Sequence, residues 1–163
     1  MEQILFYRPQ NPYGSFANFS QHSVEYKGFK AKTSEHMFQA MKFYPAHPVI
    51  FHMILRKDTP REAALAGRDT TLPLRADWDY PIVSDPKGTC ISLTKDLVMY
   101  EILKDKFTRY SELKELLLST RGKFLVEDSP IDYYWGWGED HSGKNMLGRI
   151  LVLIRDIDFA SIV

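Results

Sequence analysis

The chain has 163 residues, of which 44% are hydrophobic and 26% charged, and its 21 basic and 21 acidic residues give a formal net charge of zero. This balance is typical of one soluble globular domain and excludes an intrinsically disordered chain. A general nucleic-acid-binding surface needs a basic excess, so zero net charge argues against one, although a site for one nucleotide is compatible with it. The single cysteine, the lack of a signal-peptide pattern and the lack of a long apolar stretch favour a cytoplasmic protein that does not contact a membrane.

Apolar periodicity and turn residues predict a strand, a hairpin and three helices in the first half of the chain. The strand is expected at residues 3–7, and the hairpin at residues 23–31 around a Lys-Gly turn. The helices are expected at residues 34–44, 48–57 and 59–67. Their signals are a proline directly after the first helix, a proline in the first turn of the second, and a threonine cap with glutamate three residues later in the third.

The second half opens with an irregular stretch rich in proline and aspartate, residues 68–89. Helical spacing of apolar residues then predicts a long helix at residues 92–107, and Ser111 is a candidate cap for another helix that ends before a glycine. A strand is expected at residues 123–127. It is followed by a glycine- and aromatic-rich loop at residues 128–145, the aromatic loop, and by a last helix at residues 146–157. Because no repeat or linker interrupts this pattern, we expect one mainly helical α+β domain with a small β component.

The helix predicted after Thr33 carries an unusual polar stripe. Glu35, Gln39 and Lys42 stand at positions i, i+4 and i+7 and therefore share one face, although the residues between them are mostly apolar. An acid, an amide and an amine aligned on a core helix indicate one wall of a polar site. Taken singly, Glu35 is also explained as an acid that complements the helix dipole, and Lys42 as a solvated charge.

Two further candidates for chemistry lie outside this helix. Asp132 can act with Glu35 in general acid–base catalysis, and the ring of Trp78 can stack on a ligand. Ordinary explanations exist here as well, because acids in loops often cap turns and tryptophan is usually a packing residue.

The segment GEDHSGKN, residues 138–145, nearly matches a phosphate-binding loop. Asn145 stands where that loop requires serine or threonine, and two acidic residues inside the segment oppose phosphate, so we reject a nucleoside triphosphatase. Lys144 and the glycine amides before the last helix can still meet a phosphate or diphosphate, while a simple connecting loop is the alternative. The histidines lack metal-ligand spacing and one cysteine cannot build a zinc site, so we expect no metal ion.

Five segments of the chain together resemble the NADAR family, also called YbiA-like N-glycosidases. They occur in the family order and cover nearly the whole chain: YGSFANF (13–19), TSEHMFQAMKF (33–43), PLRADWD (73–79), KFLVEDSPIDYYWGWG (123–138) and GKNMLGRILVLIR (143–155). One departure is Ala17, which stands where the family often has serine. The resemblance implies a single YbiA-like domain over residues 1–163 that cleaves the bond between C1′ of a ribose and a base or amine nitrogen.

The resemblance also implies roles for individual side chains. Glu35, Trp78 and Asp132 match the family positions linked to catalysis, and Trp78 is expected to stack on the base. Lys42 matches the family lysine for which a covalent Schiff-base route is suggested, the alternative being that its charge steadies a leaving-group oxygen or a phosphate. The assignment of acid and base between Glu35 and Asp132 stays open, because it depends on their environments.

Further residues are expected to contact the substrate: Asn18, Phe19, Gln39, Trp135, Gly136, Lys144 and Asn145. The family is associated with two substrate groups, ADP-ribose attached to guanine and early ribosylated intermediates of riboflavin synthesis, and the first is slightly preferred. The expected partner is thus a small nucleotide or an ADP-ribosylated guanine, free or within nucleic acid, and no cofactor is required. A non-catalytic module that binds ADP-ribose or a nucleotide is the alternative from another class. No oligomeric state follows from the sequence.

Overall fold

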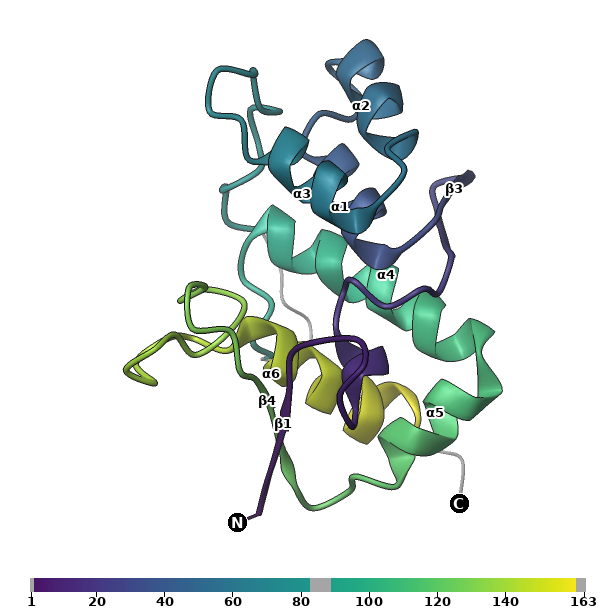
Figure 1. Ribbon diagram of the computed structural model, residues 1–163, viewed down its shortest axis with the longest axis vertical. Coiled ribbons are helices and arrows are strands. Elements are labelled where there is room, and N and C mark those ends of the chain that lie inside the picture. The colour runs from purple at the N-terminus through teal and green to yellow at the C-terminus, as the bar shows by residue number, and fades with distance from the viewer. Residues whose placement is uncertain (1, 83–88, 161–163) are drawn as a thin grey trace.

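The computed structural model of the protein describes residues 2–82 and 89–160, and helices carry most of its regular structure (Figure 1). The helices are α1 (Ser34–Met41), α2 (Pro48–Leu55), α3 (Pro60–Gly67), α4 (Thr94–Arg109), α5 (Ser111–Leu118) and α6 (Met146–Leu153). A 3₁₀ turn, Gly14–Phe16, precedes α1, and α6 continues into a π-helical turn, Ile154–Asp158. The strands are β1 (Gln3–Phe6), β2 (Val24–Tyr26), β3 (Phe29–Ala31) and β4 (Phe124–Glu127). The predicted mainly helical α+β class is confirmed.

The strands form two small, separate sheets. β1 and β4 pair in parallel, with Gln3 opposite Phe124, so the first strand of the chain lies beside one far along it. β2 and β3 form the predicted antiparallel hairpin. Its turn residues, Lys27 and Gly28, have φ values of 50° and 80°, the left-handed pair that a tight hairpin turn requires.

The helices pack around α1 and α4. Figure 1 shows α1, α2 and α3 together at one end of the molecule and α6 with the β1–β4 pair at the other, with α4 running between them. Every residue of α1 is buried, because this helix packs against α2, α3 and α4. Within the described parts of the chain, no helix has the length and apolar character needed to cross a membrane.

Local sequence signals account for most helix ends. Thr59 and Glu62 form the predicted capping box of α3, and Pro48 occupies the first turn of α2 as expected. The predicted end of the first helix is wrong by three residues, because α1 stops at Met41 and the chain turns before reaching the proline. The predicted cap at Ser111 is also wrong. Tyr110 alone separates α4 from α5, so it caps both helices and Ser111 is already helical.

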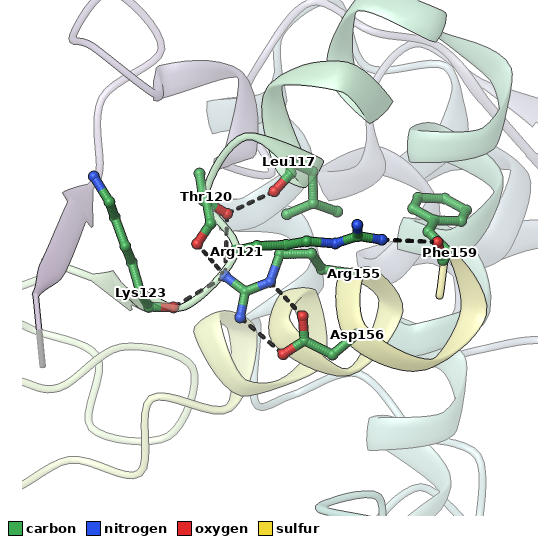
Figure 2. Close-up of polar contacts among 7 residues, drawn as sticks. All are labelled: Leu117, Thr120, Arg121, Lys123, Arg155, Asp156 and Phe159. Carbon is green, nitrogen blue, oxygen red and sulfur yellow. Dashed lines mark hydrogen bonds and ion pairs between the residues drawn. The ribbon is translucent and has the colours of Figure 1, made fainter. Parts of the chain in front are cut away.

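A buried arginine joins the C-terminal segment to the turn before β4. Arg155 is 2% exposed, and its Nη1 donates to the backbone oxygens of Thr120 (2.7 Å) and Lys123 (2.9 Å). Figure 2 shows the guanidinium between these oxygens and the carboxylate of Asp156, which accepts from Nε at 2.7 Å and from Nη2 at 2.8 Å. Since one planar group satisfies two carbonyls and a carboxylate, Arg155 fixes the chain direction into β4.

Candidate functional site

The N-terminus of α1 is anchored by the loop that precedes the hairpin. The Thr33 hydroxyl accepts from the backbone N–H of His36, which caps the helix. The Asn18 backbone oxygen accepts from the N–H of Glu35 at 3.1 Å, and its side-chain oxygen accepts from the Ser34 hydroxyl at 3.0 Å. Asn18 is therefore placed to position Glu35, and a direct contact between Asn18 and a substrate stays a prediction.

The polar stripe of α1 forms as the helical spacing predicts. Gln39 Nε2 donates to Glu35 Oε1 at 2.8 Å, while the Oε1 of Gln39 is buried without a hydrogen-bond partner in the described structure. Lys42 Nζ donates to the backbone oxygen of Gly67, at the end of α3, at 3.1 Å. The stripe is thus a polar wall that faces α3, formed by Glu35 and Gln39 on α1 and by Lys42 at the C-cap of the helix.

Burial perturbs both ionisable groups of this wall. Glu35 is 5% exposed, and burial raises the pKa of its carboxyl above the ordinary value. Burial lowers the pKa of Lys42 to about 8, against an opposing effect of Glu35 and with help from the cations Arg68 and Lys95. A lysine in this state supplies neutral amine near neutral pH, which is what nucleophilic chemistry requires.

Two carboxylates from other segments lie within electrostatic range of Glu35. Asp132 raises the pKa of Glu35, and its Oδ1 accepts from the backbone N–H groups of Tyr134 (2.9 Å) and Trp135 (2.7 Å). Burial, followed by the charges of Asp132 and Glu35, raises the pKa of Glu127 to about 8. Acid groups from α1, β4 and the aromatic loop therefore converge on one region.

Glu127 was not among the site residues expected from the sequence. A signal was present, because this acid ends an apolar strand directly before the loop that carries Asp132. Its burial, however, depends on α1 and the aromatic loop meeting in space. No group of three His, Cys, Asp or Glu side chains within residues 2–82 and 89–160 is arranged to hold a metal ion.

Aromatic side chains connect Trp78 and Trp135 to the stripe. The ring centre of Phe38, on α1, lies 5.2 Å from the ring centre of Trp78 and 5.1 Å from the ring centre of Trp135. Lys42 Nζ is 5.9 Å from the centre of the same Phe38 ring. Both tryptophans therefore sit beside the wall. Trp78 is only 5% exposed, so most of its surface is already covered by protein, and stacking on a base stays a prediction.

A cationic rim lies next to this aromatic group. Lys95 Nζ is 4.1 Å and Lys144 Nζ 5.0 Å from the centre of the Tyr134 ring. Tyr134 is held by a 2.6 Å hydrogen bond from its hydroxyl to Asp96 at the start of α4, and Lys95 pairs with Asp79 at 2.6 Å. Lys144 is exposed on this rim, so contact between Lys144 and a phosphate stays a prediction.

Three remaining candidates have mainly structural contacts. Asn145 has a φ of 50°, and its side chain donates to the Leu125 oxygen at 2.8 Å and accepts from the Glu127 N–H at 2.9 Å, so both of its polar groups are bonded to β4. A Cβ on the buried Gly136 would lie 2.9 Å from the Glu127 oxygen, so this glycine permits the loop to approach β4. Phe19 is partly exposed beside Asn18. Substrate contacts of these residues are untested.

The comparisons with known proteins agree with one another. The model of the NADAR domain matches residues 5–157. N-glycosidase Npun_R5314 of Nostoc punctiforme is 38% identical over 154 residues, covering 94% of this chain and 90% of that protein. N-glycosidase YbiA of Escherichia coli is 37% identical over 153 residues, covering 94% of this chain and 86% of that protein.

A solved structure and a longer plant protein also match this chain. The NMR structure of the E. coli protein YbiA superimposes with a TM-score of 0.79 at 37% identity, covering 95% of this chain and 83% of that one. The chloroplastic riboflavin biosynthesis protein PYRR of Zea mays is 37% identical over 166 residues, which cover 93% of this chain but 24% of that protein. Similarity therefore spans almost the whole chain.

Proposed function

The chain belongs to the NADAR domain family and is an N-glycosidase, and from that premise we propose that it hydrolyses the bond between C1′ of a ribose and the nitrogen of a base or amine. The observation that carries this proposal is the wall of α1, where a desolvated lysine and a buried acid share one helix face with a second acid nearby. A protein that only binds a nucleotide has no need of a buried amine beside converging carboxylates, whose desolvation is costly.

Cleavage of a ribosyl C–N bond leaves positive charge at C1′ and negative charge on the departing nitrogen. Carboxylates near C1′ stabilise the first, and a proton donor neutralises the second. Glu35 and Asp132 supply these carboxylate functions in the proposed site. The wall of α1 holds Glu35 in place through Gln39, so the acid needs little reorganisation when the charge develops.

Lys42 is the proposed nucleophile. The lone pair of its neutral Nζ forms a bond to C1′ as the C1′–base bond breaks, and the base leaves with a proton taken from an acid of the site. Loss of a proton from nitrogen and protonation of the ring oxygen then open the ribose and give an imine. Water adds to that imine, and its collapse restores the amine and releases the sugar. The lowered pKa of Lys42 supports this route, because a fully protonated amine has no lone pair to donate.

ADP-ribosyl-guanine is the first proposed substrate, since the cations Lys95 and Lys144 border the aromatic group and suit a diphosphate. Ribosylated intermediates of riboflavin synthesis are the second. Two relatives favour them by name, PYRR of Zea mays and the riboflavin biosynthesis protein VVA0006 of Vibrio vulnificus, the latter 34% identical over 157 residues.

The test is release of free base. Purified protein is incubated separately with ADP-ribosylated guanosine and with a ribosylated pyrimidine of the riboflavin route, and the products are separated by chromatography. We expect base release from at least one, and a loss of kcat/KM on the order of 100-fold or more in Glu35→Gln. Glu139→Gln, an exposed change in the aromatic loop, is the matched control. Binding of ADP-ribose without any release, unchanged in Glu35→Gln, would favour the non-catalytic module instead.

A further inference from the structure

We propose that Glu127 is a further catalytic residue, the acid that donates a proton to the nitrogen of the departing base. The inference rests on the proposed N-glycosidase reaction and assigns one of its steps to a residue outside the stripe of α1.

The backbone around Glu127 is fixed on both sides. Its N–H donates to the Asn145 side chain at 2.9 Å, and its carbonyl accepts from the N–H of Trp137 at 3.2 Å. The next residue, Asp128, donates its N–H to the Phe6 oxygen at 2.9 Å and so continues the pairing with β1. The Glu127 side chain thus leaves a rigid strand end, as a positioned catalytic group requires.

The carboxyl of Glu127 lacks a partner that its burial calls for. Within the described structure, two buried side-chain polar atoms have no hydrogen-bond partner, Oε2 of Glu127 and Oε1 of Gln39. Leaving such an atom unsatisfied is expensive, so each one calls for an explanation, of which a catalytic role is one. The charge of Glu35 raises the pKa of Glu127, so the Glu127 carboxyl lies within electrostatic range of the wall of α1.

A departing base can satisfy the free oxygen of Glu127. The ribosylated nitrogen of that base takes a proton as it leaves, and the carboxyl of Glu127 can give this proton. Gln39 Oε1 instead packs against Gly67 at the end of α3, so it is not assigned to the base.

The electrostatic surroundings keep the proton on Glu127 at neutral pH. Burial, then Asp132 and Glu35, raise the pKa of Glu127 to about 8, and the cation Arg68 opposes them. In the step itself, the proton passes from the carboxyl oxygen to the base nitrogen as the C1′–N electron pair moves onto that nitrogen. Glu127 is left as a carboxylate, and a proton from the water that hydrolyses the sugar adduct restores the acid.

The experiment compares two leaving groups in wild type, Glu127→Gln and the control Glu139→Gln. The first substrate is the N-riboside that wild type cleaves, and the second is 4-nitrophenyl β-D-ribofuranoside, whose nitrophenolate departs without a proton. We expect Glu127→Gln to lower kcat/KM for the N-riboside on the order of 100-fold or more and to change it less than threefold for the nitrophenyl riboside. We also expect wild-type kcat/KM on the N-riboside to fall above pH 8 and this fall to vanish in the variant.

Other results would contradict either the role of Glu127 or the proposed N-glycosidase activity. If Glu127→Gln matches wild type on the N-riboside, or keeps the alkaline fall, Glu127 is not the acid. If it loses both substrates equally with a lower melting temperature, Glu127 supports the scaffold only. The amide is isosteric with the protonated acid, so folding is expected to survive, and thermal unfolding checks this. If wild type itself releases no base from any N-riboside, the proposed function fails, and this inference fails with it.

Discussion

Lys42 is expected to titrate more than two pH units below an ordinary lysine. Burial lowers its pKa to about 8 from 10.5. At pH 7 about a tenth of the side chain is then neutral, against roughly three parts in ten thousand for an exposed lysine, a gain in nucleophile on the order of 300-fold. This gain is what makes attack on C1′ feasible at neutral pH.

The titration can be followed by NMR of the lysine Cε and Hε nuclei in isotopically labelled protein between pH 6 and 11. Lys42→Arg identifies the signal of Lys42 by its disappearance. Lys106→Met does the same for Lys106, whose pKa is also strongly lowered by burial, to about 7. Two signals with midpoints well below pH 9 are expected, and each variant should remove one.

Glu35 provides an internal check on the same measurement. Its carboxylate raises the pKa of Lys42, so Glu35→Gln should move the midpoint of Lys42 still lower. A midpoint above pH 10 in wild type would refute the desolvated amine. An unchanged midpoint in Glu35→Gln would show that the two groups of the wall do not interact.

Three further predictions concern stability, measured as the free energy of unfolding in urea. Asn145→Ala should cost about 3 kcal/mol, because it loses two hydrogen bonds to β4 and places alanine in the left-handed region. Asn145→Gly loses the same hydrogen bonds without the backbone strain and should cost about 2 kcal/mol. Equal costs would show that the left-handed backbone adds no strain. Arg155→Lys should cost about 2 kcal/mol or more, because a lysine cannot serve both carbonyls and Asp156 in one plane, and a cost below about 0.5 kcal/mol would contradict this. Burial lowers the pKa of Lys106 to about 7, so between pH 7 and 10 the unfolded state binds more protons at this site, and the contribution of Lys106 to stability should rise by about 3 kcal/mol. Lys106→Met should lack most of that rise, and an identical slope in the variant would be evidence against a buried lysine.

The parts of the fold that could be predicted are those encoded locally. The capping box at Thr59 and the turn at Lys27-Gly28 depend on neighbouring residues, and both occur as expected. The end of α1 and the cap of α5 could not be read this way. Tyr110 serves two helices at once, an arrangement set by how α4 and α5 pack rather than by a local signal.

The candidate site likewise has features set by neighbouring residues and features set by tertiary packing. The stripe of Glu35, Gln39 and Lys42 follows from helical geometry alone, and the hydrogen bond between its first two members bears out that geometry. Burial of Glu127 depends on segments far apart in the chain, so its sequence context gave no measure of its charge state. Asn145 stands in a loop suited to ligands, but tertiary structure directs its amide to the edge of β4.

Borohydride reduction during turnover tests whether the amine of Lys42 forms an imine with the sugar. Protein is mixed with its N-riboside and sodium borohydride, digested and mapped by mass spectrometry, with Lys42→Arg as the control. We expect a stable sugar adduct on the peptide that contains Lys42, formed more readily as the pH approaches 8 and absent from the variant. Full turnover by wild type with no adduct on that peptide, or an adduct that persists in Lys42→Arg, would contradict it.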